Sequence, residues 1–276
     1  MSKFYHYTSM DTLFCMLKDS IKVNQCTKQE YLEFWATDIN FMNDATERSL
    51  FVGVLLDRVK HFAKKQKRDL TTEQELALSR LCYDDMYVIS LSDEKLSDDL
   101  NMWRGYGNNG AGVCLGLDFS KVPVSYWNNE KHISVLEDVY SPRKCCYDPI
   151  QIEDSLIEAV FRELTQDGKD YFCDTISKAA IMSRIANISP YYKHKAYISE
   201  SEWRFVLSSL GEISFNKYGN KIKPYRTFPI PLSALTSIMI GPCIKDSNTI
   251  VGIEYMIKSK LGNDFEIKYS AIPYRG

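Results

Sequence analysis

Residues 6–9 form the first stretch whose side chains can do chemistry, because an imidazole is followed there by three hydroxyl groups. Phe4 and its neighbours favour a strand, and a helix cap is expected just before the apolar pattern of residues 10–17. Donors beside the free amides of a helix N-terminus suit ribose hydroxyls or a phosphate. The candidate ligand-binding residues are therefore His6, Tyr7, Thr8 and Ser9. The alternative interpretation of His6 is a histidine that only satisfies the fold.

Glu200, Glu202 and Arg204 form the second stretch. If Glu202 lies in a strand, the three side chains share one face, which places two carboxylates and a guanidinium close together. Arg204 then favours the charged form of a neighbouring carboxylate. Such a group can orient a sugar hydroxyl or stabilise a developing cation. A surface ion-pair ladder is the alternative, although the apolar residues 205–207 place the row beside a core.

The third stretch combines Ser90 and Ser92 with Trp103, Tyr106 and the glycines of residues 107–112. Aromatic rings close to a glycine-rich strand entry can stack on a planar ligand, and the glycines let the backbone approach it. Packing of both aromatic residues in the core is the alternative. The glycine order differs from the Gly-x-Gly-x-x-Gly fingerprint, so a Rossmann dinucleotide site is not predicted.

The remaining polar features, a cluster at residues 41–47 and the eight cysteines, carry weaker signals. The simplest role of the cluster is to cap the helix that follows it, but Asn43 or Asp44 can also line a site. The cysteines include no Cys-x-x-Cys pair, and Cys145-Cys146 has no nearby histidine at zinc-ligand spacing. No metal site is therefore expected.

The elements that must position these stretches indicate an α+β protein. Helical patterns cover residues 50–85, as two helices, residues 152–188, as a hairpin broken at Asp167-Gly168, and residues 100–106 and 247–261. The segments with strand composition are residues 4–7, 86–92, 110–119, 202–207, 225–230, 235–240 and 265–270. We expect one α+β domain over residues 1–276, with a mixed, largely antiparallel sheet flanked by helices and a helical insertion at 151–190.

Composition limits the classes of function. The chain of 276 residues is 45% hydrophobic and 25% charged, which is enough to bury a core without disulfides or metals. Its net charge of −2 gives no global attraction to nucleic acid or anionic membranes, and the basic run at 58–68 indicates a solvated helix end. No apolar run approaches a membrane span and the first residues lack a secretion signal, so we expect a cytoplasmic protein with reduced thiols.

The order of these motifs resembles a widespread bacterial family of unassigned function. The likeness runs over residues 4–210 and rests on the combination of motifs rather than on any one of them. Its parts are Tyr5-His6-Tyr7-Thr8-Ser9, Phe41-Met42-Asn43-Asp44 with Glu47, Ile89-Ser90-Leu91-Ser92, Met102-Trp103 with Tyr106, Gly110 with Gly112, and Glu200 with Glu202-Trp203-Arg204. The resemblance implies membership of that family and no particular activity.

The chain is also similar, more weakly, to ADP-ribosyltransferases, which begin with a histidine-containing strand and, in some members, carry Glu-x-Glu on a late strand. By this likeness, His6 contacts the nicotinamide-side ribose, and Trp103 or Tyr106 stacks on nicotinamide. Glu202 is the catalytic carboxylate, and Glu200 orients the acceptor. The other residues assigned to ligand binding are Tyr7, Thr8, Ser9, Asn43, Ser90, Ser92 and Arg204. The middle motif departs from the family pattern, since Ser90-Leu91-Ser92 stands in place of Ser-Thr-Ser.

The implied reaction is cleavage of the nicotinamide–ribose bond of NAD, with NAD as the substrate and no metal ion. The acceptor is a protein, a nucleic acid or water. An unrestrained NAD-consuming enzyme harms its host, which fits a toxin or an antiviral defence role and a regulatory partner protein. A non-catalytic nucleotide-sensing or protein-interaction module on the same fold is the alternative. A nuclease is a third hypothesis, which rests on scattered acidic residues and the basic run.

The strand ends at His6, Tyr106 and Glu202 predict where a site forms. Each residue falls at the end of a predicted strand, and sites are built by the loops at such ends. We therefore expect the three to converge in one cleft with Trp103 and Glu200, and to lie within about 12 Å of one another. A Glu202 closed off in a surface ion pair with the neighbouring arginine, far from His6, would contradict the mechanism.

Overall fold

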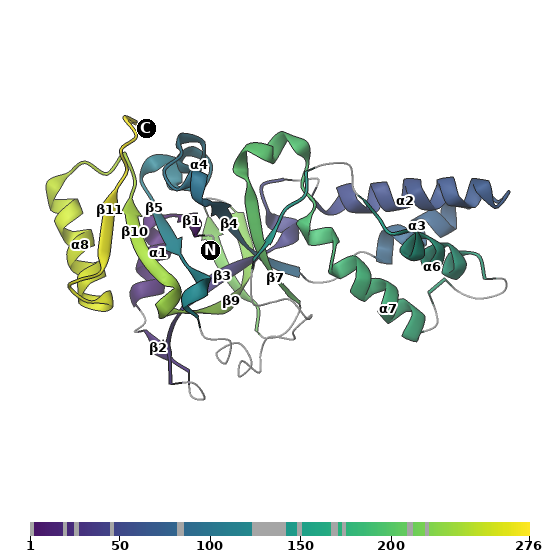
Figure 1. Cartoon of the computed structure of the whole chain (residues 1–276), viewed down its shortest axis with the longest axis horizontal. Helices are drawn as coiled ribbons and strands as arrows, with labels where there is room; N and C mark the ends of the chain where they lie inside the picture. Colours follow the sequence, from purple (N-terminus) through teal and green to yellow (C-terminus); the bar gives the residue numbers. More distant parts are fainter. Residues whose placement is uncertain are drawn as a thin grey trace.

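The computed structural model describes residues 3–18, 21–24, 28–44, 47–81, 86–122, 142–147, 151–166, 171–172, 175–208, 212–218 and 221–276. Within these residues the chain forms an 11-stranded sheet with helices against it and at one end (Figure 1). β10 and β11 pair in parallel, whereas the other ladders among the described strands are antiparallel. The predicted α+β class with a mixed, largely antiparallel sheet is thus confirmed.

The elements follow one another from a short N-terminal strand to a strand near the C-terminus. The strands are β1 (Phe4–Thr8), β2 (Lys22–Val23), β3 (Glu30–Asp38), β4 (Met86–Asp93), β5 (Val113–Leu117), β6 (Arg143–Lys144), β7 (Glu202–Ser208), β8 (Ser214–Tyr218), β9 (Lys221–Pro231), β10 (Leu235–Ile240) and β11 (Glu266–Tyr269). The helices are α1 (Met10–Lys18), α2 (Glu47–Lys65), α3 (Thr72–Leu81), α4 (Leu100–Gly105), α6 (Asp154–Leu164), α7 (Thr175–Ala186) and α8 (Ser247–Leu261). None of the helices in this part of the chain combines the length and the hydropathy needed to cross a membrane.

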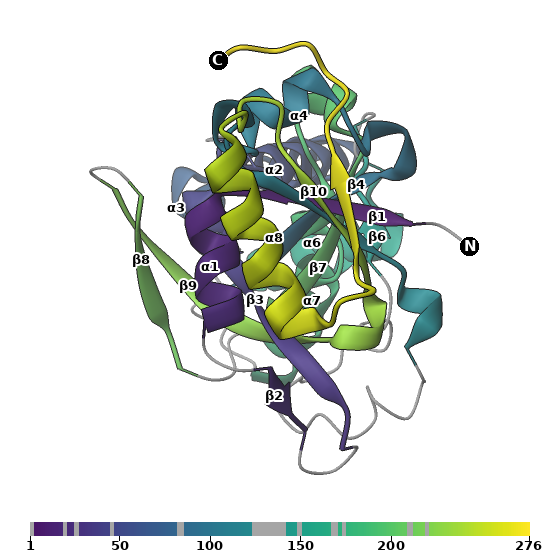
Figure 2. The ribbon, with the colours of Figure 1, turned by 90° about the vertical axis from the view of Figure 1, so that its left-hand side faces the viewer.

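The main core lies between the sheet and two helices, α1 and α8 (Figure 2). Leu13 and Leu17 of α1 and Ile253 and Ile257 of α8 contribute to this core, because each pair is spaced by one helical turn. The predicted packing of the first helix against the sheet is confirmed. The helix predicted at 247–261 is found with the same bounds.

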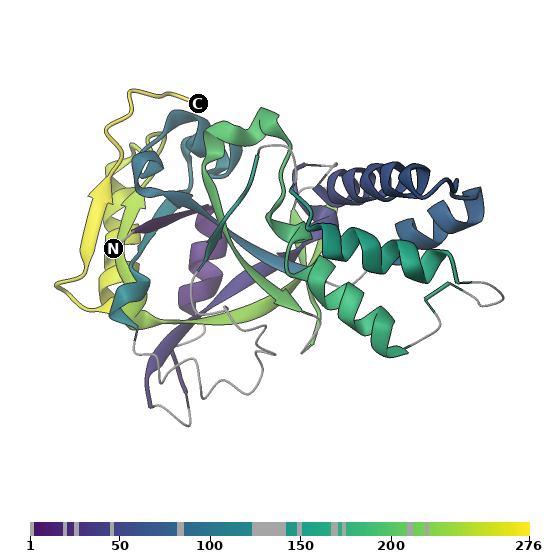
Figure 3. The same cartoon turned by 45° about the vertical axis from the view of Figure 1, so that its right-hand side comes forward.

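Helices α2, α3, α6 and α7 form a helical lobe at one end of the sheet (Figures 1 and 3). Their apolar side chains make a second core, which includes Phe51, Leu55, Val160 and Leu164. The helices predicted within 50–85 and 152–188 are present. α6 packs against α7, as expected of a helical hairpin, and it also packs against α2 and α3. The predicted break at Asp167-Gly168 lies outside the described residues.

On one of its two edges, strand β4 pairs with different strands at its two ends. β7 follows one edge of β4 over residues 86–92. On the other edge, β3 pairs with residues 87–88, whereas β1 pairs with residues 92–93. Among the described strands, residues 89–91 therefore pair only with β7. The sheet divides at this point between β1 and β3.

Strand β3 is the longest strand that the sequence analysis did not predict. Leu32, Phe34 and Ala36 face the core while the residues between them are more exposed, which is the period-two pattern of a strand. Strands β2, β6 and β8 were also not predicted. The strand predicted at 110–119 is shorter, because Gly110 has φ 84° and still belongs to the turn that precedes β5.

Gly112 lies so close to β1 that a Cβ atom there would be 2.2 Å from the Thr8 carbonyl oxygen and 2.8 Å from that of Gly107. Both obstacles are backbone atoms, so we expect Gly112→Ala to lower the free energy of unfolding by more than about 2 kcal/mol. Gly53→Ala in α2 is the matched control, since nothing lies within 4 Å of its Cβ position. It should stabilise the protein by about 0.5–1 kcal/mol. Urea unfolding followed by circular dichroism measures both, and equal effects would contradict this packing.

Candidate functional site

A cavity lies along β4 where the sheet divides. Its lining consists of Tyr5, His6 and Tyr7 from β1, Trp35 and Thr37 from β3, Met42 and Asn43, Val88, Ile89, Ser90, Leu91 and Ser92 from β4, Met102, Tyr106, Lys193, Glu200, Glu202 and Lys223. Segments that are far apart in the sequence therefore meet around one space. Aromatic, apolar and polar side chains all contribute to its walls.

His6 bridges the division of the sheet. Its Nδ1 lies 2.9 Å from the backbone carbonyl oxygen of Ser90, within the part of β4 that neither β1 nor β3 pairs with. A carbonyl oxygen can only accept, so Nδ1 carries the proton and Nε2 of the neutral ring is an acceptor. Burial lowers the pKa of His6, and the Ser90 carbonyl opposes this effect without overcoming it. The imidazole is therefore neutral at physiological pH.

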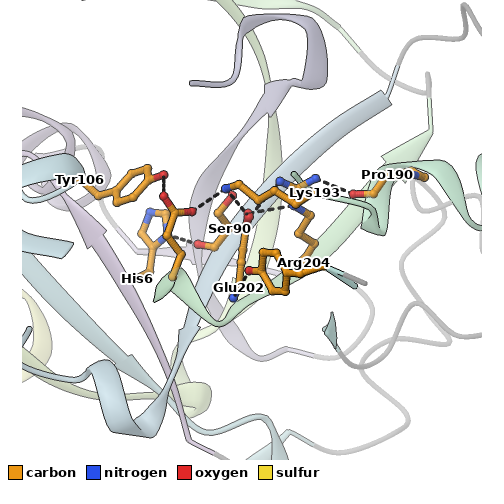
Figure 4. Close-up of polar contacts among 9 residues, drawn as sticks. His6, Ser90, Tyr106, Pro190, Lys193, Glu202 and Arg204 are labelled. Atoms are coloured by element: carbon orange, nitrogen blue, oxygen red, sulfur yellow. Dashed lines mark hydrogen bonds and ion pairs between the residues drawn. The ribbon is translucent and has the colours of Figure 1, made fainter. Parts of the chain in front are cut away.

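A series of hydrogen bonds and ion pairs runs from Tyr106 to Arg204 along the cavity wall (Figure 4). The Tyr106 hydroxyl donates to Glu200 Oε1 at 2.6 Å. Lys193 Nζ donates to Glu200 Oε2 at 2.5 Å and to Glu202 Oε2 at 2.8 Å, so one ammonium group joins the two carboxylates. Arg204 binds Glu202 through Nε and Nη2, at 2.8 and 2.9 Å. We call these five residues the charge relay of the cavity.

The charge relay is buried and its formal charges cancel. The side chain of Lys193 is 3% exposed, that of Glu202 4% and that of Arg204 0%, whereas Glu200 keeps 16%. Two carboxylates face one ammonium and one guanidinium, which is the pairing that buried charges require. The remaining side of Arg204 donates from Nη1 to the Pro190 carbonyl oxygen at 2.5 Å.

Burial and pairing act in opposite directions on these groups. Burial alone would raise the pKa of Glu202, but Arg204 and Lys193 lower it to about 2. Burial also disfavours the Lys193 ammonium, yet Glu202, Tyr106 and Glu200 raise the pKa of Lys193 above its usual value. The pKa of Tyr106 is raised, mainly by burial. At neutral pH the Glu202 carboxylate and the Lys193 ammonium are therefore charged, and Tyr106 is a protonated donor.

Glu200 and Glu202 belong to different elements, which corrects the prediction that both lie on one strand face. Glu200 ends the 3₁₀ helix η6 (Lys195–Glu200), and Glu202 begins β7. Ser201 between them is left-handed, with φ 41° and ψ 49°, so the chain turns there. The two carboxylates therefore meet through Lys193 and not through strand spacing.

Lys193 is the central residue that the sequence analysis missed. It follows the 3₁₀ helix η5 (Ser189–Tyr191), in the segment that leaves α7. No motif or periodicity marks it. The available signal is charge balance, because two glutamates beside a core need a second cation in addition to Arg204. The fold decides which lysine of the chain supplies that cation.

Most of the residues assigned to the site from the sequence line this one cavity. They are His6, Tyr7, Asn43, Ser90, Ser92, Tyr106, Glu200 and Glu202. Ser90 Oγ is buried and has no hydrogen-bond partner among the described residues, so it is available to a ligand. Tyr7 uses its hydroxyl within the protein, because it donates to the Leu96 carbonyl oxygen at 2.6 Å and accepts the Asp99 N–H at 3.1 Å.

Trp103 lies outside the cavity lining, which corrects the prediction that it joins the cleft and stacks on a ligand. Its side chain is 0% exposed. Its indole N–H donates to Asp98 Oδ1 at 2.7 Å, and its ring meets that of Tyr7 edge to face. Trp103 is therefore a packing residue under the cavity wall, and no ligand ring can reach its face.

Thr8, Ser9 and Arg204 also lie outside the lining. Ser9 caps α1, since its Oγ accepts the Thr12 N–H at 3.1 Å, and Thr8 is buried. Both hydroxyl groups predicted to contact a ligand beside the helix N-terminus are thus placed away from the cavity. Arg204 contacts Glu202 and acts on a ligand only through that carboxylate.

Comparison with known proteins finds one family model that matches part of the chain. Residues 102–205 match a family model described as "Protein of unknown function (DUF2971)". This segment contains every residue of the charge relay, from Tyr106 to Arg204. No curated protein and no solved structure matched the chain. The resemblance to ADP-ribosyltransferases gains no support from these comparisons and stays an expectation.

Lys193→Met removes the ammonium between two buried carboxylates and should lower the free energy of unfolding by about 3–5 kcal/mol. Lys22→Met is the matched control. Lys22 Nζ also lies 2.8 Å from a carboxylate oxygen, that of Glu33, but these side chains are 47% and 31% exposed. Its loss should therefore cost less than about 1 kcal/mol. Urea denaturation measures both changes, and equal losses would show that Lys193 does not hold the carboxylates.

The stability that Glu202 contributes should depend on pH in one direction. Its folded pKa of about 2 is below the ordinary value of 4.5, so the unfolded chain takes up the proton first as the pH falls. The contribution is complete above about pH 5 and is lost as the pH falls toward about 2. The difference in unfolding free energy between the wild type and Glu202→Gln, about 3 kcal/mol at neutral pH, should shrink below about pH 5. A difference that stays constant in acid would rule out this pairing.

Proposed function

We propose that this protein cleaves the nicotinamide–ribose bond of NAD, as an ADP-ribosyltransferase or an NAD glycohydrolase. The observation that carries the proposal is the Glu202 carboxylate, which is ionised, held in one orientation, and part of the lining of a cavity with aromatic walls. An anion fixed in a cavity of low dielectric is suited to stabilise positive charge that develops on a sugar.

The reaction breaks the bond between the anomeric carbon and the nicotinamide nitrogen, and the electron pair leaves with the ring. Positive charge then develops on the ribose. Arg204 and Lys193 occupy three of the four acceptor positions of the Glu202 carboxylate in the contacts described, and the fourth, on Oε1, can accept a ribose hydroxyl. Ser90 Oγ and the neutral His6 ring add polar contacts beside it.

The aromatic side chains of the lining provide the surface for the nicotinamide ring. Tyr5, Trp35 and Tyr106 line the cavity, and Tyr106 takes over the stacking role that the resemblance also offered to Trp103. Glu200 is the more exposed of the two carboxylates, so it is placed to orient the attacking group and to accept its proton. The attacking atom, from a protein, a nucleic acid or water, forms the new bond to the anomeric carbon.

The cellular role follows from the chemistry. An enzyme that consumes NAD without restraint harms the cell that makes it, which favours a toxin or an anti-phage effector held in check by a partner protein. The protein acts in the cytoplasm under this proposal, where its substrate is available.

A non-catalytic module that binds a nucleotide is the second candidate. The observation in its favour is the charge balance of the relay, because the two cations that keep Glu202 ionised also neutralise the carboxylates. A balanced site can position a ligand without stabilising a developing cation. This candidate predicts tight binding of NAD with no release of nicotinamide.

Incubation of the protein with NAD labelled in the nicotinamide ring separates the two candidates. The wild type should release nicotinamide, and Glu202→Gln should release it about 10²- to 10³-fold more slowly. Glu200→Gln should slow transfer to an acceptor. Glu153→Gln is the matched control, because the Glu153 side chain is 75% exposed and pairs on the surface with Arg184.

Circular dichroism of each variant establishes that it is folded before its rate is compared. If Glu202→Gln does not fold, the folded Glu200→Gln variant still tests the site. Binding of NAD without release of nicotinamide by the wild type would favour the second candidate. The absence of both binding and release would refute the proposed function.

A further inference from the structure

The sheet ends at strand β8, and the outer edge of this strand is open. β8 pairs with β9 alone among the described strands, and the strand order of the sheet ends there. In Figure 2, β8 forms the outer strand of this hairpin, on the side of β9 away from α1. From this edge we infer that two copies of the chain pair in solution, β8 against β8, as an antiparallel continuation of the sheet. This surface lies outside the cavity, and its pairing is independent of the proposed function.

The register of the hairpin shows which backbone groups the open edge presents. Phe215 lies opposite Pro224 of β9. Proline has no N–H group, so these two residues cannot exchange both bonds of a hydrogen-bonded pair. Because hydrogen-bonded and non-hydrogen-bonded pairs alternate along an antiparallel ladder, Phe215 and Lys217 turn their N–H and C=O groups away from β9. Within the described residues these groups form no hydrogen bond outside the hairpin, so they can pair with another strand.

Large apolar side chains are exposed on this hairpin. Phe215 is 68% exposed, and Ile222, which lies diagonally across from it on β9, is 64% exposed. Ile213, just before β8, is 44% exposed. Phe228 lies on the same face of β9 as Ile222, because an even number of residues separates them, and it is buried in the main core. The apolar face of the sheet therefore continues onto the hairpin, beyond the part that the described core covers.

The opposite edge of the sheet, β11, carries the charged side chains that commonly prevent pairing between edge strands. Glu266 and Lys268 are 58% and 40% exposed there, and their charged groups lie 3.2 Å apart. Prolines and bulges protect other edges in the same way. β8 contains no proline, and its ladder with β9 has no register shift. Lys217 is the one charged residue within β8, so this edge has much weaker protection.

The sequence of β8 is complementary to itself when two copies run antiparallel. Pairing over all five residues places the two-fold axis at Asn216, so Phe215 of each copy lies opposite Lys217 of the other. Both residues turn their backbone groups outward, which is the phase that a hydrogen-bonded pair requires. Each lysine then meets an aromatic ring, which attracts a cation, instead of a second lysine. A second copy therefore supplies backbone and side-chain partners together.

The size of this contact predicts a reversible dimer. Two paired five-residue strands bury less than the roughly 1,200 Å² of a standard stable interface, so we expect a dissociation constant in the micromolar range. The two-fold axis is perpendicular to the joined sheet, so the two cavities lie on the same face of it. Asn216 pairs with Lys223, which lines the cavity. The β9 ends of the two cavities thus lie on either side of the joint.

Sedimentation equilibrium at protein concentrations from about 1 to 500 µM tests this pairing, because the range includes the expected dissociation constant. The mass of the wild type should rise from 31.9 kDa to about twice that value and no further, since an isologous pair is closed. Phe215→Lys should weaken the dimer more than about tenfold, because it places like charges opposite each other in two symmetric pairs. Adding Lys217→Glu to this variant should restore the dimer, because opposite charges then face each other.

Tyr255→Lys in α8 is the matched control, because Tyr255 is 77% exposed and lies on a helix away from the sheet edge. It should dimerise as the wild type does, and a loss equal to that of Phe215→Lys would refute the edge as the interface. Circular dichroism establishes that each variant is folded. A wild type that stays monomeric up to about 500 µM would refute the pairing and leave the edge to a strand of another protein. A double variant that stays monomeric would refute the contact between residues 215 and 217.

Discussion

Arg204 imposes the constraint on which the site depends, because a guanidinium with no solvent exposure must be paired within the protein. Its donors reach the Glu202 carboxylate and the Pro190 carbonyl oxygen. The backbone of Glu202 is held as well, since its N–H donates to the Tyr147 hydroxyl at 2.9 Å and its carbonyl accepts the Cys145 N–H at 2.8 Å. The Arg204 guanidinium therefore joins β7 to the segment that leaves the helical lobe, and the backbone of Glu202 joins β7 to the segment around β6.

The helical lobe is coupled to the site through two neighbouring residues. Tyr192 belongs to the core of the lobe, where its ring lies 5.9 Å from that of Phe51 in α2. Lys193, the next residue, reaches Glu200 and Glu202 in the cavity wall. The packing of the lobe thus determines the position of the Lys193 ammonium group. Although the lobe has its own core, the position of the charge relay depends on it.

The division of the sheet explains how a cavity can form beside buried strands. A strand that loses its neighbour leaves carbonyl and N–H groups that need other partners. His6 satisfies the Ser90 carbonyl with its ring, which occupies the place of a strand ladder at that position. Polar and aromatic side chains of β4 and its neighbours therefore line a cavity beside the gap between β1 and β3, and this carbonyl is not left unpaired.

Local sequence determined the elements whose signals are periodic or capped. The helix at 247–261 follows Asp246, whose carboxylate accepts the Thr249 N–H, and α1 follows Ser9 in the same manner. Such signals lie within a few residues of one another, so the chain carries them before it folds. The assignment of Glu202 to the start of a strand with Arg204 on the same face was local in the same sense and is confirmed.

Only the tertiary structure decided which side chains meet. Trp103 and Tyr106 lie in one helical turn, and packing against Tyr7 buries the first while the second reaches Glu200. Lys193 enters the site because the lobe ends beside β7, which no spacing in the sequence records. The periodicity of apolar residues indicates which face of a helix or strand is buried, but it does not indicate which other element packs against that face. Burial and charge balance, which make the site, are properties of elements already packed together.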